Sequence, residues 1–311
     1  MTNAAEVRDR RYKLEIAYDT DPQSPRDWGN LGTMVCWHRR YNLGDDHKYA
    51  NIDDLLKNLI RDCGTISDDS MIAYVKSGKA DGLRLEYNKS DREWELTYYD
   101  DYFKKWYSAG SYDAPLDSER GIVADGILEN MLTGDLLDLA GKAYLIKPLY
   151  LYDHSIQSIS TDSFVGRAHH ADWDSGQVGV VYVSFDDVKK EYGNASPESV
   201  EKAEKVINAE VDNYDSYIRG ECYGFRLFEK GEEIDSCWGF LGDFDDALKG
   251  IADQLPKEAK YLAQNAEYGA CKVAEPKKDL LGRVGKAKSK VAAQTAPVHS
   301  QDRKKTTEVR E

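Results

Sequence analysis

The chain has 311 residues, with 42 Lys and Arg against 56 Asp and Glu, which gives a formal net charge of −14 at pH 7. Its hydrophobic fraction of 41% is large enough to bury a core, which excludes a wholly disordered chain. No apolar run approaches the roughly 20 residues that a membrane-spanning helix needs, and the first residues carry no apolar signal region. These features predict a cytoplasmic protein that makes no membrane contact.

The charge is divided unequally along the chain. Residues 272–311 contain 11 Lys or Arg and 5 Asp or Glu, a net charge of +6, so residues 1–271 carry −20. The basic segment has no aromatic residue and too few apolar ones to offset the entropy of ordering it, so we predict a disordered tail. Such a tail could make a weak contact with nucleic acid, while the acidic charge belongs to the folded body.

In the first half of the chain, short periodic runs predict the elements. Residues 12–18 alternate between apolar and polar and predict a strand, and residues 33–38 predict a second one. Apolar residues at helical spacing predict a helix over 51–63, which Gly64 ends. Further on, we predict two strands within 82–99, a helix over 102–107 and a longer helix over 122–139.

The second half of the chain is richer in strands. Residues 143–152 and 177–185 predict strands, and β-branched residues fill most of the second. Ser184 is placed to cap a short helix, and Ser196 with Pro197 is placed to begin a long helix that ends near Gly220. The rest of the body is predicted to contain a hairpin of 223–228 with 234–240, and helices over 243–254 and 257–268.

Strands and helices are mixed here without a repeating βαβ rhythm. This mixture predicts an α+β fold, with a mixed, largely antiparallel sheet, flanking helices and the disordered tail. We expect a main domain of residues 11–61 and 143–271, an inserted lobe of residues 62–142, and the tail of residues 272–311. The alternative is that residues 62–142 extend one edge of the main-domain sheet instead of forming a separate lobe.

Four segments differ from ordinary scaffold because they mix aromatic side chains with charged and amide ones in loops and at strand ends. They cover residues 27–45, 150–155, 169–177 and 235–239. If their strands pair in one sheet, the segments meet at a common cleft. The candidate binding residues are Trp28, Trp37, His38, Arg39, Asn42, Asp45, Asp153, His154, Trp173, Asp174 and Trp238.

Asp153, His154, Asp172 and Asp174 form a candidate metal-ligand set, because carboxylates and neutral imidazole bind divalent cations. Residues 172–176 have the beginning of a calcium loop, but the other ligand positions of an EF-hand are missing. The histidine and cysteine patterns of zinc sites are missing too. The alternative is a set of Asx turns with packed aromatic side chains at a sheet end. A divalent metal is the one cofactor to consider.

Known catalytic patterns for phosphate loops, dinucleotide binding and nucleophile elbows do not occur in the sequence. Cys36 and His38 are a possible nucleophile and base, since residues two apart on a strand share a face, but no third group is evident. The sequence therefore favours a protein that is not an enzyme. A metal-dependent enzyme built on the candidate ligand set remains the alternative.

Four runs of the sequence stand out by their length and composition: DWGNLGTMVCWHRRYNLGD, IKPLYLYDHS, DWDSGQVGVVYVSFDDVKKEYG and EIDSCWGF. In these runs the chain resembles an uncharacterised family of proteins encoded by phages and mobile elements. The runs fall within residues 11–47 and 143–242, so the resemblance implies an insertion between these two blocks. It implies no activity and no residue role.

A phage origin predicts an accessory protein that binds and antagonises a host defence or nucleic-acid-processing protein through its acidic surface. One route is mimicry, in which paired carboxylates occupy the cationic groove of a host nucleic-acid-binding enzyme. The alternative is that acids at helix starts stabilise the helices, as the predicted starts near residues 186 and 245 suggest. The acidic pairs are Asp45–Asp46, Asp53–Asp54, Asp68–Asp69, Asp100–Asp101, Asp186–Asp187, Glu232–Glu233 and Asp245–Asp246.

Overall fold

A computed structural model describes residues 3–274 of the chain. The chain divides into two compact units. Unit 1 contains the residues up to Ala17, Gly224–Cys237 and the residues from Leu248 onward, and unit 2 contains Tyr18–Tyr223 and Trp238–Ala247. These units do not coincide with the expected main domain and inserted lobe, so that division remains a prediction.

The strands between residues 3 and 274 lie in three sheets rather than in the single sheet expected. A five-stranded sheet has the order β11-β10-β2-β1-β12, a four-stranded sheet β3-β9-β7-β8, and a three-stranded sheet β4-β5-β6. The pairing of β1 with β12 is parallel, whereas the pairs of the other two sheets are antiparallel. The α+β class with mixed, largely antiparallel pairing is confirmed.

In unit 1 the core is formed by alternating residues of β2 and β10. Leu14 and Ile16 of β2, with Phe225 and Leu227 of β10, are almost fully buried, as expected of strands with one face on a core. The sheet takes its strands from β1 (Asn3–Arg8), β2 (Tyr12–Tyr18), β10 (Cys222–Glu229), β11 (Glu232–Leu241) and β12 (Cys271–Val273), and α8 (Phe244–Gln254) and α9 (Lys260–Ala263) lie between the last two strands in sequence.

Strand β12 also bears on the predicted tail. Lys272 and Val273 pair with β1, so the first residues of that tail are part of a sheet and the prediction of disorder is wrong for them. Strands β1 and β12 are far apart along the chain, so no local sequence pattern could predict their parallel pairing. The remainder of the predicted tail lies outside the described residues.

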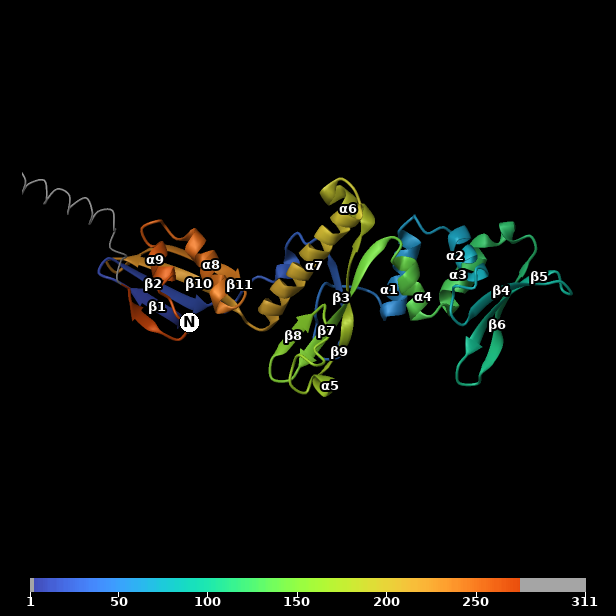
Figure 1. Cartoon of the computed structure of the whole chain (residues 1–311), viewed down its shortest axis with the longest axis horizontal. Coiled ribbons are helices and arrows are strands. Elements are labelled where there is room, and N and C mark those ends of the chain that lie inside the picture. The colour runs from blue at the N-terminus through green and yellow to red at the C-terminus, as the bar shows by residue number, and fades with distance from the viewer. Residues whose placement is uncertain (1–2, 275–311) are drawn as a thin grey trace, which may run out of the picture. The chain divides into compact units, whose positions relative to one another are not determined.

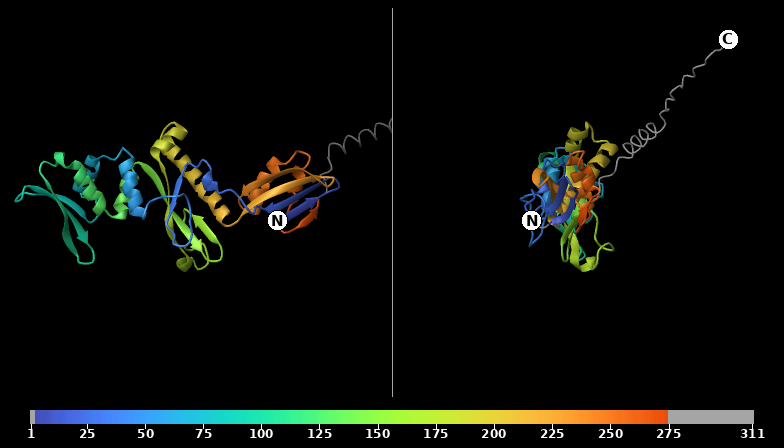
Figure 2. Two further views of the ribbon diagram at one scale, coloured as in Figure 1. Left: turned by 180° about the vertical axis from the view of Figure 1, so that it is seen from behind. Right: turned by 90° about the vertical axis from the view of Figure 1, so that its left-hand side faces the viewer.

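The four-stranded sheet of unit 2 has helices on both faces. Val181 and Val183 pack into a cluster with α7, whereas Val180 and Tyr182, which alternate with them along β9, pack with α1 and α4 on the opposite face. Figures 1 and 2 show this arrangement, with α7 on one side of the sheet and α1 and α4 on the other. The elements are β3 (Thr33–Cys36), β7 (Tyr144–Asp153), β8 (Gln157–Ser160), α5 (Ala171–Asp174), β9 (Ser175–Ser184), α6 (Phe185–Tyr192) and α7 (Pro197–Ile218).

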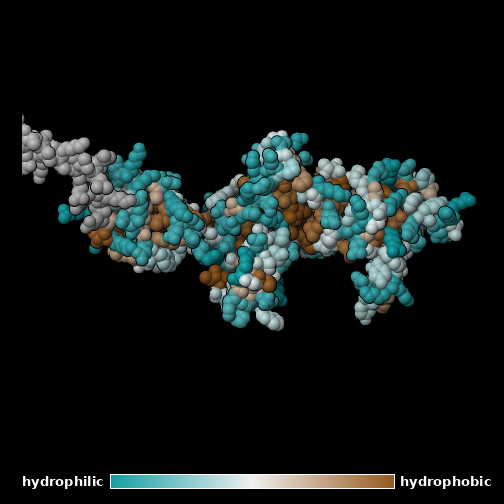
Figure 3. Space-filling model, viewed as in Figure 1, coloured by the Kyte–Doolittle hydropathy of each residue, from teal (hydrophilic) through white to brown (hydrophobic). Residues whose placement is uncertain are grey.

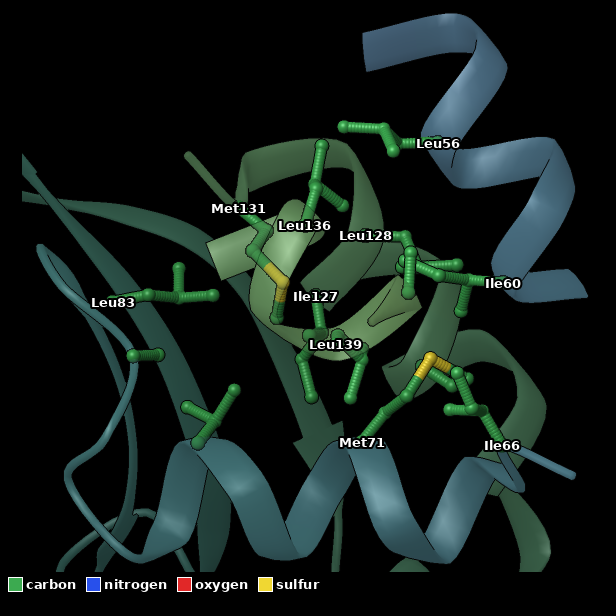
Figure 4. Close-up of a cluster of buried hydrophobic side chains, with 14 of the residues drawn as sticks. Leu56, Ile60, Ile66, Met71, Leu83, Ile127, Leu128, Met131, Leu136 and Leu139 are labelled. Atoms are coloured by element: carbon green, nitrogen blue, oxygen red, sulfur yellow. The ribbon is translucent and has the colours of Figure 1, made fainter. Parts of the chain in front are cut away.

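A second group of elements in unit 2 packs around its own hydrophobic core. Leu56 and Ile60 of α1 are buried in one cluster with side chains of α2, α3 and α4, among them Met71, Ile127 and Leu136 (Figure 4). Helix α1 therefore belongs to this core. The elements are α1 (Ile52–Asp62), α2 (Asp68–Lys76), β4 (Leu83–Asn88), β5 (Glu93–Asp100), β6 (Lys105–Asp113), α3 (Arg120–Asn130) and α4 (Thr133–Ala140), with short 3-10 helices at Pro25–Asp27 (η1) and Leu116–Ser118 (η2).

Several helix starts follow from their capping residues. The hydroxyl oxygen of Ser184 accepts a hydrogen bond from the amide of Asp187, and that of Ser196 accepts one from the amide of Ser199. Both caps were predicted from the sequence and are confirmed. Each satisfies an amide that a helix N-terminus leaves without an intrahelical partner.

Three of the predicted helices are wrong. The one expected over 257–268 is helical only at Lys260–Ala263. Residues 102–107 form a turn and the start of β6, because the Asp100 carboxylate accepts hydrogen bonds from the amides of Tyr102 and Phe103. The predicted helix over 122–139 is two helices, since Met131 adopts an extended backbone between α3 and α4. Local hydrogen bonding by an Asp side chain outcompeted the helical pattern over residues 102–107.

No helix within residues 3–274 is both long enough and apolar enough to cross a membrane. The face of the molecule seen in Figure 3 is largely hydrophilic. Hydrophobic residues gather on it between α7 and α1, over the four-stranded sheet.

Candidate functional site at the end of the four-stranded sheet

A cavity of about 280 Å³ lies at the end of the four-stranded sheet where β7 ends and β9 begins. Antiparallel pairing sets Tyr152 of β7 opposite Ser175 of β9, so residues 23 positions apart along the chain become neighbours. The loop that follows β3 completes the wall. Five candidate binding residues line the cavity, namely Trp37, His38, Asp153, Trp173 and Asp174.

Trp173 is held in an exposed position by the short helix α5. The hydroxyl of Ser175 donates a hydrogen bond to the carbonyl of Ala171 over 2.6 Å, which closes the helix where β9 begins. The hydroxyl of Tyr152 donates to the carbonyl of His169 over 2.9 Å and ties the preceding loop to β7. Trp173 is 88% exposed, although its backbone is fixed at both ends of the helix.

Asp153, the last residue of β7, connects three elements. One carboxylate oxygen accepts a hydrogen bond from Arg40 over 3.0 Å, and the other accepts from the hydroxyl of Tyr41 over 3.3 Å and from the amide of Gln157 over 3.1 Å. These contacts fasten the loop after β3 to the ends of β7 and β8. Asp153 therefore shapes the cavity while its own hydrogen-bonding capacity is largely used.

Asp174 has a different environment. Its carboxylate lies 2.8 Å from Nδ1 of His154, whose side chain is 48% exposed. The His154 ring also stacks near Tyr152, with the ring centroids 6.1 Å apart. Asp174 lines the cavity and its side chain is 31% exposed, so a cation or hydrogen-bond donor from a binding partner can approach it.

Trp37 forms a rigid part of the wall. Its indole N–H donates a hydrogen bond to the carbonyl of Tyr49 over 2.9 Å, and its ring meets the ring of His47 edge-on, with 5.5 Å between centroids. Nε2 of His47 lies 2.8 Å from the carbonyl oxygen of Cys36, to which it donates. The polar atom of the tryptophan is thus satisfied inside the protein, and its ring supplies apolar surface.

The structure gives Cys36 and His38 no nucleophile–base geometry. Cys36 is buried, and burial raises the pKa of its thiol to about 12. The thiolate that such chemistry needs is therefore disfavoured at neutral pH. Nδ1 of His38 lies 3.3 Å from the amide nitrogen of Tyr41, from which it accepts a hydrogen bond, and its ring stacks on the Tyr41 ring.

The candidate metal ligands are not assembled into one site. Across residues 3–274 no group of three or more His, Cys, Asp or Glu side chains is placed to hold a metal ion. Asp174 contacts His154, whereas Asp153 is engaged by Arg40, and Asp172 is exposed in the first turn of α5. The expected ligand set is wrong as a cluster, because each carboxylate has its own surroundings.

Asp45 has a structural role away from the cavity. Its carboxylate accepts two hydrogen bonds from Arg26, over 2.8 and 2.7 Å, and one from the amide of Met34 over 2.8 Å. The Arg26 side chain is only 6% exposed. This paired contact fixes the loop before β3 to the loop after it.

The four other candidate binding residues do not line the cavity either. Trp28 ends η1 and is 46% exposed. Arg39 and Asn42 are exposed on the loop after β3, and Trp238 lies on β11, which belongs to a different sheet. The expectation that all four unusual segments share one cleft is therefore met by three of them.

Three residues that shape this site are not among the predicted binding residues. Arg40 lies beside Arg39 in the same segment, and only the structure shows which of the two reaches Asp153. Gln157 belongs to β8, a strand of four residues that is too short to show periodicity. Gln177 stands in the strongest predicted strand, where its place at the cavity depends on how β9 pairs.

No family model, curated protein or solved structure matches the chain. The resemblance to phage and mobile-element proteins accordingly remains a prediction. The choice of this site as the candidate therefore depends on its geometry alone.

Proposed function

We propose that the chain is a binding protein that docks on a host protein through the cavity at the end of the four-stranded sheet. The observation that carries this proposal is the exposure of Trp173, at 88%, on a backbone fixed by α5. Tryptophan is enriched among the residues that dominate binding energy, and a rigidly held one loses little entropy when it is buried. In the host cytoplasm, such docking would antagonise a defence or nucleic-acid-processing protein.

The partner surface is expected to be basic. Residues 1–271 carry a net charge of −20, and Asp174 presents its carboxylate to the cavity. Complementary charge raises the association rate and disfavours acidic partners. A host nucleic-acid-binding enzyme has such a surface, and blocking it would explain antagonism without any catalysis by this chain.

Mimicry of a nucleic acid has less support than docking at the cavity. Four of the seven acidic pairs lie in the first turns of α1, α2, α6 and α8, where negative charge stabilises a helix. In the other three pairs, Asp45 is bound to Arg26, Asp100 caps a turn, and Glu233 pairs with Arg226. The fold thus accounts for at least one acid of every pair without a partner.

The test is affinity capture from host cells that express the full chain. We expect the Trp173→Ala variant to lose the captured host protein. Tyr102→Ala is the matched control, because Tyr102 is an aromatic residue with 87% exposure on the turn between β5 and β6. The control should capture as well as the wild type. Equal capture by Trp173→Ala would contradict the proposal.

Salt dependence then separates the two routes. A mimic that replaces many phosphates should lose about a thousandfold or more in affinity between low and moderate salt. Docking centred on Trp173 should lose less than about tenfold over the same range, because apolar burial is not screened. A steep loss would favour mimicry and count against docking at the cavity.

A further inference from the structure

The first part of β9 is paired on one side only. Its pairing with β7 runs from Ser175 to Ser184, whereas its pairing with β3 covers only Gly179–Tyr182. The chain leaves the sheet after Cys36, and the amide of Trp37 makes a last hydrogen bond to the carbonyl of Val178. Among residues 3–274, no strand pairs with Ser175–Gln177 on that side.

This edge of β9 carries no charged side chain and no proline, two common protections of an open sheet edge; it reads Ser-Gly-Gln, and the register shift next to it lies at Val178, where β3 begins to pair. A Cβ at Gly176 would meet no atom within 4 Å, whereas one at Gly179, where β3 pairs, would lie 2.0 Å from the Val35 carbonyl oxygen. The backbone at Gly176 is therefore open to another chain.

Two cavities adjoin at this edge. The second has a volume of about 430 Å³ and shares Trp37, Gln177 and Val178 with the first. The first contains Leu151, which packs in the core cluster beneath α7, and the second contains Val180, which packs in the cluster of α1 and α4. The cavities thus lie toward opposite faces of the sheet.

The two cavities differ in chemistry. The first is polar: its wall holds Asp174 and the ion pair of Asp153 with Arg40, so two carboxylates face one guanidinium. The second is bounded by Ile52 of α1 and Leu137 of α4, and Leu137 is 37% exposed. Successive side chains of a strand point to opposite faces of a sheet, so an added strand would place neighbouring residues in the two cavities.

We infer that an extended segment of the partner adds to the open edge of β9 as a short strand in line with β3. The segment has a basic residue beside an apolar one: the basic side chain enters the acidic cavity and the apolar side chain enters the cavity of Ile52 and Leu137. Main-chain hydrogen bonds to β9 supply affinity, and the two cavities supply specificity. This inference rests on the proposed function and names the element that the site recognises.

The first experiment uses the full chain and a capped peptide probe of sequence Thr-Val-Leu-Arg-Thr. Titration to millimolar peptide should shift the backbone amide NMR signals of Gly176 and Gln177. An analogue with N-methyl groups on Leu and Arg cannot donate main-chain hydrogen bonds, and we expect it to bind about tenfold more weakly or worse. Unshifted signals, or equal binding by the analogue, would overturn the inference.

The second experiment separates this inference from the proposed function. Leu137→Asp places a charge in the apolar cavity and should weaken capture of the host protein about tenfold. Leu132→Asp is the matched control, because Leu132 is 51% exposed just before α4 and does not line the cavity. If Leu137→Asp captures normally while Trp173→Ala does not, strand addition fails and docking at the cavity stands.

Another occupant of the edge would show itself differently. A second copy of the chain would give concentration-dependent association in analytical ultracentrifugation, reversed by the peptide. That result would overturn the assignment of the edge to a partner segment. A monomer that binds the peptide at Gly176 and Gln177 supports the assignment.

Discussion

Segments 24–45 and 153–177 have similar compositions, but their side chains have different environments in the structure. Both mix aromatic residues with acidic, basic and amide ones, and both border the four-stranded sheet. In the first, Arg26 is 6% exposed and is bound to Asp45 by two hydrogen bonds. In the second, Trp173 is 88% exposed beside an open cavity.

The difference lies in which side chains each segment leaves exposed. Glu210 of α7 accepts hydrogen bonds from the amides of Leu31 and Gly32, so even the backbone of the first segment is tied to a neighbouring helix. The second segment is also held by internal hydrogen bonds, such as that of Ser175 to Ala171, but it leaves Trp173 in solvent beside the cavity. Composition marks both segments as polar and aromatic, and burial distinguishes a structural cluster from a binding surface.

The largest expected effect comes from a matched pair of arginines. Arg26→Met leaves Asp45 without its paired donor in a partly buried place, and should lower the free energy of unfolding by about 3–5 kcal/mol. Arg40→Met removes an ion pair to Asp153 from a side chain that is 63% exposed, and should cost less than about 1 kcal/mol. Urea denaturation measures both. Similar losses would mean that the two segments are not structurally different.

Two aspartates, Asp45 and Asp174, should differ in role: we expect the first to matter for stability and the second for binding. Asp45→Asn weakens the three hydrogen bonds that the carboxylate accepts, and should cost about 2 kcal/mol of stability. Asp174→Asn should change stability by less than about 0.5 kcal/mol but weaken host-protein capture about tenfold. Thermal unfolding and capture are measured on both variants. Normal capture by Asp174→Asn would remove the acidic cavity from the binding surface.

The sequence predicted elements well where the signal was local. Strand β2 has its predicted bounds, and α7 begins at Pro197 after its Ser196 cap, as predicted. The two cores on opposite faces of the four-stranded sheet could not be predicted, because Val180 and Val181 look alike until the pairing with β7 and β3 is known. Register is a property of two strands rather than one.

The candidate site was predictable as a set of segments and not as a set of contacts. Asp153 and Asp174 both stood at strand ends, and β7–β9 pairing brings their segments together. Nothing local reveals that Asp153 would be occupied by Arg40 while Asp174 would face the cavity. Asp45 was misjudged for the same reason, since its partner Arg26 lies 19 residues away.

A smaller effect concerns the pH dependence of stability at Cys36, which ends β3 within the first segment and is buried. Burial raises the pKa of this thiol from 9.0 to about 12, so the folded state favours the protonated form. The contribution to stability is complete below pH 9 and is lost as the pH rises toward 12. Between pH 8 and 10, wild type should lose about 1 kcal/mol more than Cys36→Ala. Equal losses would show that Cys36 is accessible to solvent.

The smallest effect is spectroscopic and compares the tryptophans of the cavity wall. Trp173 is 88% exposed, so the emission lost in Trp173→Phe should lie at the red edge of the spectrum and be quenched strongly by iodide. Trp37 donates its indole N–H to Tyr49 and packs against the core of α1 and α4, so the emission lost in Trp37→Phe should be bluer and weakly quenched. When the captured partner is added, the Trp173 emission should shift to the blue by more than the Trp37 emission, because docking removes the more exposed ring from water. A shift in the Trp37 emission alone would place the contact on the inner wall of the cavity rather than at its exposed rim.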